Sequence, residues 1–104
     1  MDGKQTNILY IGRNADILET VMRLLNKNEQ WCGFGAGTDE EAMQQFQQNN
    51  CDLVLLGPGI SDASEAKLCA FFKQQKPGIL IVQHYGGGSG LLAAEIEIAM
   101  AQKK

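Results

Sequence analysis

Few residues in this 104-residue chain are of a type that does covalent chemistry, and those few are scattered. Cysteines stand at positions 32, 51 and 69, and His84 is the only histidine. An odd number of cysteines without a Cys-x-x-Cys pair predicts neither a disulfide framework nor a zinc site. We therefore expect small buried thiols, a reduced cytoplasmic compartment, and no metal or cofactor.

Glycine-rich segments follow three apolar runs, at Gly12-Arg13, at Gly57-Pro58-Gly59 and at residues 86–90. In an open α/β sheet, ligands bind beyond the carboxyl ends of the strands, where such loops converge. The loops after the first and third strands supply no nucleophile, acid or metal ligand. The residues that an anion or another small ligand would meet at this edge are Gly12, Arg13, Gly57, Gly59, Gln83, His84, Gly87, Gly88 and Ser89.

Each candidate at this edge has a plainer alternative. His84 is a ligand group or a phosphoryl acceptor, or else a strand-end residue without a role. The Gly86–Gly90 loop is an anion site at a helix N-terminus, or else a flexible connection, and it lacks the Lys-Ser/Thr of a Walker A loop. Arg13 binds an anion, or else forms a surface ion pair with Asp16 or Asp62.

The elements that must position these loops alternate regularly between strand and helix. Apolar runs predict strands at 8–11, 31–36, 52–56 and 79–82, and helical periodicity predicts helices at 15–27, 39–48, 63–75 and 89–102. Such alternation indicates a parallel sheet with right-handed crossovers. We therefore expect one domain over residues 1–104, a flavodoxin-like three-layer α/β sandwich with a four-stranded parallel sheet of order 2-1-3-4.

Local signals mark where two of the helices begin. Asn14 or Asp16 is suited to cap the first helix. Thr38, with Glu41 three residues later, has the spacing of a capping box for the second helix.

The charge composition argues against two classes of binding partner, nucleic acids and anionic membranes. The chain has 9 Lys and Arg residues against 12 Asp and Glu residues, a formal net charge of -3, so we expect no binding to nucleic acid or to an anionic membrane. No apolar stretch approaches the ~20 residues needed to span a bilayer. The N-terminus is polar, which is not typical of a secretory signal.

A surplus of apolar residues near the C-terminus predicts a protein partner. With the order 2-1-3-4, the fourth strand is a sheet edge without a charged residue to protect it. The last helix is apolar on two sides, and such a helix usually covers two surfaces. We expect a homodimer or a contact with another protein through Ile79, Ile81, Leu91, Ala94 and Ile98.

Four segments carry a family resemblance. They are Ile8-Leu9-Tyr10-Ile11, Ala15-Asp16-Ile17-Leu18, Thr38-Asp39-Glu40-Glu41-Ala42 and Asp52-Leu53-Val54-Leu55-Leu56. Together they resemble the first strand, first helix, start of the second helix and third strand of the receiver (CheY-like) domain of bacterial response regulators. The resemblance covers about residues 7–85 and implies a role in signal transduction.

The residues that the receiver family uses for phosphorylation are missing. The resemblance implies a Mg²⁺-binding acidic pair after the first strand, but Gly12-Arg13 stands there. Its phosphoacceptor Asp falls on Gly57, and its Thr or Ser after the fourth strand falls near Gln83. The family's fifth strand, with its Lys, and its fifth helix have no counterpart. Because a hard cation needs oxygen ligands, this resemblance implies a degenerate receiver without aspartyl phosphorylation.

The second half of the chain resembles a different family. Leu55-Leu56-Gly57-Pro58 and Tyr85-Gly86 before the last helix resemble the IIB domain of lactose/cellobiose-type sugar phosphotransferases. That family carries its phosphoryl group on a Cys directly after the first strand, a position that is Gly12 here. Both resemblances thus place the reactive residue on a glycine.

We expect a non-catalytic, receiver-like signalling or scaffold module that acts by protein binding or dimerisation. One alternative is an IIB-like phosphocarrier whose acceptor has moved, most plausibly to His84. Another is a small anion- or nucleotide-binding domain built from the three glycine-rich loops.

Overall fold

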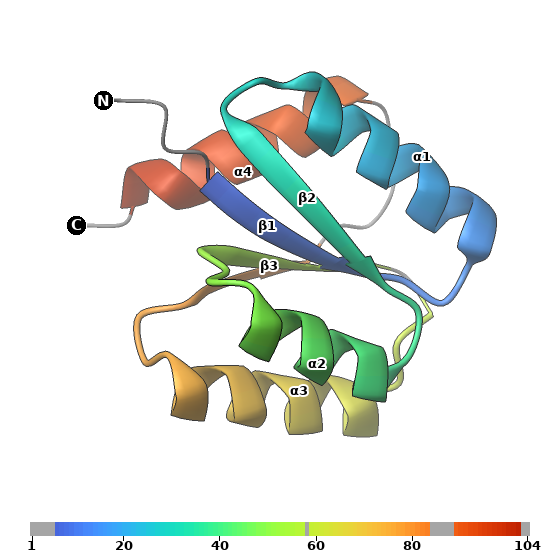
Figure 1. The fold of residues 1–104 in the computed structure, drawn as a ribbon, viewed down its shortest axis with the longest axis vertical. Helices are drawn as coiled ribbons and strands as arrows, with labels where there is room; N and C mark the ends of the chain where they lie inside the picture. The colour runs from blue at the N-terminus through green and yellow to red at the C-terminus, as the bar shows by residue number, and fades with distance from the viewer. Residues whose placement is uncertain (1–5, 58, 84–88, 103–104) are drawn as a thin grey trace.

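A parallel four-stranded sheet forms the middle layer of the protein (Figure 1). The computed structural model describes residues 6–57, 59–83 and 89–102. The strands are β1 (Thr6–Ile11), β2 (Trp31–Ala36), β3 (Leu53–Leu56) and β4 (Leu80–Gln83), in the order β2-β1-β3-β4. The helices are α1 (Ala15–Lys27), α2 (Asp39–Gln48), α3 (Asp62–Gln75) and α4 (Ser89–Gln102). The predicted flavodoxin-like architecture and strand order are confirmed.

Element boundaries differ from the prediction by one or two residues. β1 begins at Thr6 rather than at residue 8, because the Thr6 N–H already bonds to the Gln30 carbonyl beside β2. β3 begins one residue later than expected, and β4 is shifted by one residue to include Gln83. These shifts leave the predicted topology unchanged.

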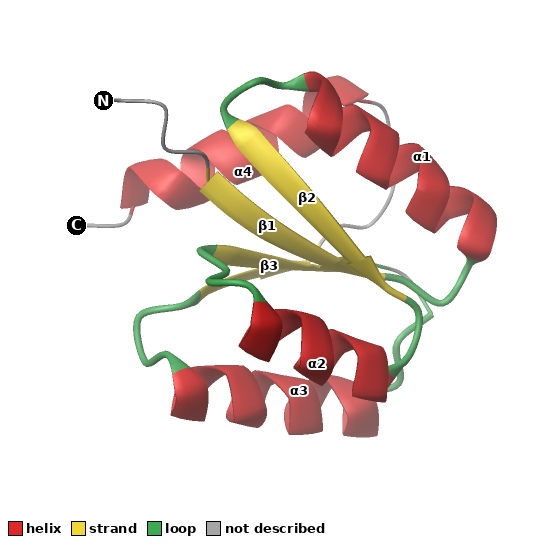
Figure 2. Cartoon of the chain, viewed as in Figure 1, coloured by secondary structure: helices red, strands yellow, loops and turns green. Residues whose placement is uncertain are grey.

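Two helices cover each face of the sheet (Figure 2). Leu9 and Ile11 of β1 pack in a cluster with α2 and α3, whereas Ile8 and Tyr10 pack in a cluster with α1 and α4. This division follows from strand geometry, since successive side chains point to opposite faces. Every residue of 8–11 and 53–56 is at most 3% exposed, as expected for central strands of a parallel sheet covered on both faces.

The carboxyl ends of β1 and β3 lie level with each other. The parallel register pairs Ile8 with Leu53 and Ile11 with Leu56. At the end of the pairing, the Gly57 N–H donates to the Ile11 carbonyl at 2.8 Å. The two loops that begin at Gly12 and Gly57 therefore leave the sheet side by side.

Side-chain caps fix the helix starts at this same edge. Asn14 caps α1 by accepting from the Ile17 N–H at 3.0 Å, so Asn14 rather than Asp16 is the cap. Thr38 Oγ1 accepts from the Glu41 N–H at 3.1 Å, as predicted. The Glu41 carboxylate, however, accepts from the Gly37 N–H at 2.8 Å, one residue before the position that a capping box uses.

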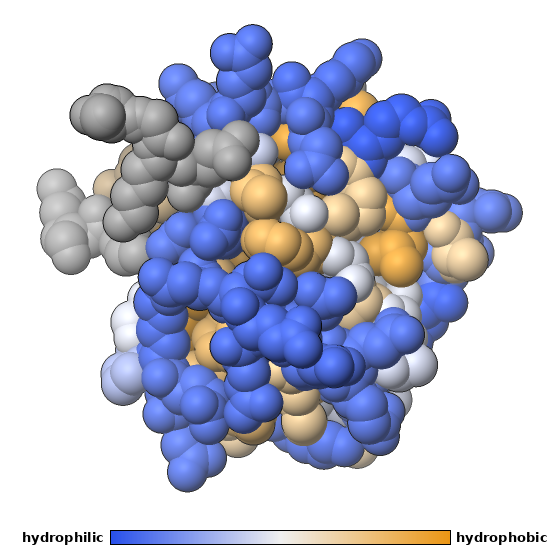
Figure 3. Space-filling model, viewed as in Figure 1, coloured by the Kyte–Doolittle hydropathy of each residue, from blue (hydrophilic) through white to orange (hydrophobic). Residues whose placement is uncertain are grey.

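The face of the protein drawn in Figure 3 is mainly polar, with apolar exceptions. In the view of Figure 3, hydrophilic side chains cover α2, while apolar surface gathers over β2 between α1 and α2. Ile17 of α1 is 39% exposed and Ile98 of α4 is 60% exposed. Within the described ranges, none of the helices has the length and apolar character needed to cross a membrane.

Candidate functional site

The Tyr10 side chain fills the space between the first and third strand-end loops. Tyr10 is fully buried, and its ring lies against Gly12 and Gly57. A Cβ atom at Gly57 would overlap the Tyr10 hydroxyl and lie 2.7 Å from Tyr10 Cζ. A Cβ atom at Gly12 would lie 2.7 Å from Tyr10 Cε2. Real Cβ atoms essentially never approach so closely, so a side chain at either glycine requires Tyr10 to move.

The Tyr10 phenol has little freedom to move and stays protonated. Its hydroxyl and ring belong to the cluster on the α1 and α4 face, where neighbouring Ile8, Leu53 and Leu55 are each 0% exposed. Burial raises the pKa of the Tyr10 phenol above its ordinary value, because desolvation penalises the phenolate. The centre of the edge is therefore occupied by a neutral aromatic group of the chain itself.

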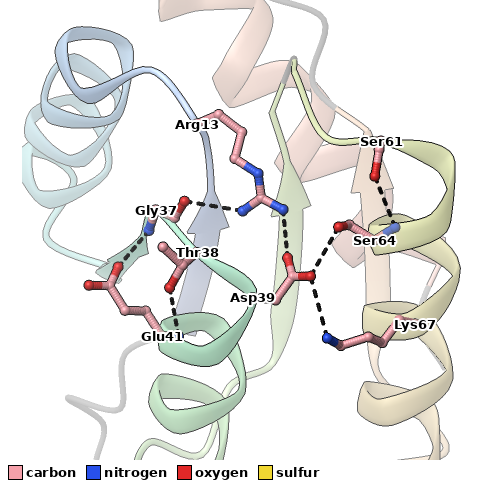
Figure 4. Close-up of polar contacts among 8 residues, drawn as sticks. All are labelled: Arg13, Gly37, Thr38, Asp39, Glu41, Ser61, Ser64 and Lys67. Atoms are coloured by element: carbon pink, nitrogen blue, oxygen red, sulfur yellow. Dashed lines mark hydrogen bonds and ion pairs between the residues drawn. The ribbon is translucent and has the colours of Figure 1, made fainter.

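Arg13 crosses the edge to reach α2 (Figure 4). Its guanidinium donates to the Asp39 carboxylate at 2.5 Å and to the Gly37 carbonyl at 3.1 Å. The predicted ion pair with Asp16 or Asp62 is wrong. β1 and β2 are neighbours, so the loop after β1 lies beside the N-terminus of α2, which follows β2 directly.

Asp39 joins three elements through its two carboxylate oxygens. Besides Arg13, it accepts from Ser64 Oγ at 3.0 Å and lies 3.6 Å from Lys67 Nζ, both on α3 (Figure 4). The hydrogen bond from Arg13 is the main cause that lowers the pKa of the Asp39 carboxyl; Ser64 and the positive charges of Arg13 and Lys67 lower it further, against the opposing effect of burial. Asp39 is thus an anion whose charge is already matched within the protein.

A cavity of about 370 Å³ lies beside this cluster. Its lining comprises Leu56, Gly57, Gly59, Ile60, Asp62, Glu65 and Gln83. Gln83 donates from Nε2 to Glu65 at 2.6 Å. The described lining offers two carboxylates and no Lys or Arg, which is unfavourable for an anion or a phosphate.

A larger cavity of about 600 Å³ lies at the opposite, amino edge of the sheet. It is lined by amide-rich ends of α2 and α3, residues 46–51 together with Gln75 and Lys76. Lys76 Nζ there donates to the Cys51 carbonyl at 2.7 Å and lies 3.6 Å from Asp52. The lysine is therefore engaged in joining α3 to the start of β3.

The structure brings most of the predicted ligand residues to one edge but gives them other partners. Gly12, Arg13, Gly57, Gly59 and Gln83 all lie at the carboxyl ends of β1, β3 and β4. The Arg13 and Gln83 side chains bond to carboxylates, and Tyr10 covers the two glycines. His84, Gly87 and Gly88 lie outside the described residues, and Ser89 begins α4, with its side chain also outside them.

The predicted interface residues divide into two groups. Ile79 is 7% exposed and belongs to the core beside α3, so it does not contribute a free surface. Ile81 is half-buried against the same cluster. Ala94 and Ile98 are exposed on α4, and the Leu91 side chain lies outside the described residues.

Of the three thiols predicted to be buried, Cys51 is buried, whereas Cys32 and Cys69 are half-buried. Cys51 is 1% exposed, and burial, aided by the Asp52 charge, raises its pKa to about 11. Burial also raises the pKa of the half-buried Cys69. In the described part of the chain, no group of three or more His, Cys, Asp or Glu residues is placed to hold a metal ion.

Four residues of this site were missed by the sequence analysis: Tyr10, Asp39, Ser64 and Lys67. Asp39 and Ser64 carried a partial signal, because each lies in the first turn of a helix whose N-terminus points to the ligand edge. Tyr10 had no sequence signal of a role at this edge, apart from its position near the end of a buried strand. Its reach over two glycines depends on the register between β1 and β3.

Comparison with known proteins establishes the fold. No protein family model and no curated protein sequence matches the chain. Among solved structures, a CheY-like receiver domain protein from Methanospirillum hungatei JF-1 superposes with a TM-score of 0.79 at 16% identity, over 96% of this chain and 97% of that one. The signal receiver domain of an HD domain-containing protein from Pseudomonas fluorescens Pf-5 gives 0.76 at 16% identity, over 96% and 98%.

A chemotaxis protein, CheY4 of Vibrio cholerae, is similar over 91% of this chain and 98% of its own, with a TM-score of 0.68 and 12% identity. These identities are low, but the superpositions span nearly the whole of each chain. The protein therefore has the fold of response-regulator receiver domains.

Proposed function

We propose that this protein is a receiver-like signalling or scaffold module that acts by binding protein and is not switched by aspartyl phosphorylation. The observation that carries the proposal is the contact between Tyr10 and Gly57. By the receiver resemblance, residue 57 is where the phosphoacceptor would stand. The space for any such side chain is taken by the Tyr10 phenol.

The charges around this position support the same proposal. By the receiver resemblance, the Mg²⁺-binding acidic pair falls on Gly12 and Arg13, which offer no carboxylate. Asp39 lies near, but Arg13 and Lys67 already neutralise it. Mg²⁺ requires oxygen ligands in near-ideal octahedral geometry, and a carboxylate paired with a guanidinium is a poor ligand. We therefore propose a binding protein rather than an enzyme.

The two alternatives find less support. A phosphocarrier needs a nucleophile, and Cys51 is buried with a raised pKa on the far side of the sheet from Gly12. An anion site at the strand-end loops would use Arg13, whose guanidinium is engaged with Asp39 and Gly37. The neighbouring cavity presents Asp62 and Glu65, which repel anions.

The proposed binding surface lies at β4 and α4. The four residues of β4 are half-buried, whereas the four residues of β3 are buried. On α4, Ala94 and Ile98 are exposed four residues apart, so they share one helical face. An apolar helix face beside an open sheet edge is the kind of surface that protein partners cover.

Intact-mass measurement after incubation with acetyl phosphate and Mg²⁺ tests the absence of phosphorylation. We expect the mass to stay unchanged while a phosphorylatable receiver domain in a parallel reaction gains a phosphoryl group. A stoichiometric adduct on an Asp residue would overturn the proposal. An adduct mapped to His84 would overturn it in favour of the phosphocarrier.

A further inference from the structure

A cavity of about 600 Å³ lies between the ends of α2 and α3, at the amino edge of the sheet. Residues 46–51, Gln75 and Lys76 line it, and we call it the amide cavity. Its volume is within the usual range of small-molecule sites, about 300–1,000 Å³. It lies at the opposite edge of the sheet from Gly57 and Arg13, so the proposed function makes no use of it.

Packing between α2 and α3 brings the ends of both helices to this cavity. Each helix runs from the carboxyl end of one strand to the amino end of the next, so both end at the same edge (Figure 1). The rings of Phe46 on α2 and Phe72 on α3 lie 4.6 Å apart, which holds the two helices together. The amide side chains at 47–50 therefore share one cavity with Gln75, although they are far apart in the sequence.

Part of the lining is fixed by hydrogen bonds within the protein. Asn49 Nδ2 donates to the carbonyl and to Oε1 of Gln45, each at 3.0 Å. Lys76 Nζ donates to the Cys51 carbonyl at 2.7 Å and to Asn50 Oδ1 at 3.3 Å. These bonds tie the segment after α2 to the end of α3, so this part of the cavity is formed before any ligand binds.

Three glutamines of the lining keep their side-chain amides free for a ligand. Gln47, Gln48 and Gln75 are exposed, and within the described part of the chain their side chains make no hydrogen bond. Each amide offers two N–H donors and a carbonyl oxygen that accepts. The three side chains together can therefore both donate to and accept from one ligand.

The charges around the amide cavity favour a neutral ligand. Of the residues that line it, only Lys76 is charged, and its ammonium lies 3.6 Å from the Asp52 carboxylate. An anion would compete with Asp52 for this ammonium. A cation would be repelled by the ammonium and would find no carboxylate in the lining. A neutral molecule meets neither penalty.

The lining favours a ligand rich in hydroxyl groups over an apolar one. Its apolar residues, Phe46 and Cys51, are 7% and 1% exposed, so they present little apolar surface to a ligand. The amides dominate instead, and covering them with an apolar molecule would cost the hydrogen bonds that they make to water. A hydroxyl group both donates and accepts, so it matches either end of an amide.

We propose that the amide cavity binds a neutral, polyhydroxylated small molecule of the size of a mono- or disaccharide. The hydroxyl groups of this ligand bond to the free amides of Gln47, Gln48 and Gln75, and the ligand lies across the ends of both helices. The inference goes beyond the proposed function and does not depend on it. Because the cavity exists only in the folded protein, the ligand also stabilises the fold.

Titration of the full chain with maltose, a neutral disaccharide, tests the site by ¹H–¹⁵N NMR, which detects side-chain amides as well as backbone N–H groups. We expect saturable shifts in the side-chain signals of Gln47, Gln48 and Gln75 and in the backbone signals of 46–51. An unchanged spectrum with maltose in large excess, or shifts confined to other residues, would overturn the inference. Inorganic phosphate is the second probe and should leave these signals unchanged. If phosphate shifts them and maltose does not, the cavity is an anion site at Lys76 and the inference is wrong.

A pair of glutamine substitutions tests whether the free amides hold the ligand. Gln75→Ala removes one of them and should weaken maltose binding by roughly 2–10-fold, the usual effect of losing one hydrogen bond. Gln44→Ala is the matched control, because Gln44 is an exposed glutamine of α2 outside the lining, and it should leave the affinity unchanged. Both variants should fold, since Ala is the best helix former. Equal affinities of the wild type and both variants for maltose would overturn the inference.

Discussion

The hydroxyl of Tyr10 occupies the position into which any side chain at residue 57 would project. Tyr10 lies on β1 and Gly57 directly follows β3. The carboxyl ends of these two neighbouring parallel strands are level, so the Tyr10 side chain lies over the Gly57 backbone. In this chain the crevice that open α/β sheets use for ligands is therefore closed at its centre by the fold itself.

Gly57→Ala should destabilise the protein, because its Cβ overlaps a buried ring that has no free space to enter. We expect a loss of about 1–3 kcal/mol in the free energy of unfolding, the usual cost of overpacking a core. Urea denaturation measures it. Gly78→Ala is the control, because a Cβ there meets no atom within 4 Å, and it should change stability by less than about 1 kcal/mol. Equal effects of the two substitutions would contradict the contact.

A double-mutant cycle tests whether Tyr10 is the cause of that loss. Tyr10→Ala alone should cost about 3–5 kcal/mol, since it leaves a cavity in a packed cluster. In the Tyr10→Ala background, Gly57→Ala should cost much less than it does in the wild type, giving a coupling of about 0.5–3 kcal/mol. Additive losses would show that the backbone of Ile11, 3.0 Å from the same Cβ, limits residue 57 instead.

The fold was predictable because each element carries its own signal. Apolar runs marked β1 and β3, which are buried on both faces, and Asn14 and Thr38 marked helix starts by local hydrogen bonds. The site was only partly predictable. Strand order alone brings Arg13 and Gly57 to one edge.

The contacts that Arg13 and Gly57 make at this edge depend on how the strands are paired and on which helix starts beside each loop. The partner of Arg13 is Asp39, 26 residues away, because β2 returns beside β1 and delivers α2 to the same loop. No periodicity in the sequence distinguishes Asp39 from the nearer Asp16. The contact between Tyr10 and Gly57 was not predicted for the same reason, because it depends on the pairing of β1 with β3.

The Asp39 cluster should make stability depend on pH in acid. The folded-state pKa of Asp39 lies below its usual value of 3.8, so its ionised form stabilises the fold above that pH. This contribution is lost as the pH falls through the folded-state pKa. Asp39→Asn should therefore cost about 1 kcal/mol at neutral pH, and the difference from wild type should shrink below about pH 4. Urea unfolding across this range measures it.

A matched variant distinguishes the specific bonds of Asp39 from the general effect of a negative charge at the N-terminus of α2. Glu40→Gln removes an exposed carboxylate from the next residue of α2 and should leave both the stability and its acid dependence nearly unchanged. If Asp39→Asn and Glu40→Gln lose stability equally, a general effect of negative charge at the N-terminus of α2 accounts for the result. The specific bonds to Arg13, Ser64 and Lys67 would then be unnecessary.

Asn26→Ala tests whether a side-chain cap on the edge strand β2, the hydrogen bond from the Gly33 N–H to Asn26 Oδ1, limits association. The substitution removes the acceptor for the outward N–H of Gly33 but leaves α1 a better helix former at that position. We expect a loss of about 1 kcal/mol in the free energy of unfolding, from the lost hydrogen bond, and association that grows with concentration in sedimentation velocity. Lys27→Ala, at the next exposed position of α1, should leave the assembly unchanged. If Asn26→Ala sediments like the wild type at every concentration, the side-chain cap is not what stops growth of the sheet at β2.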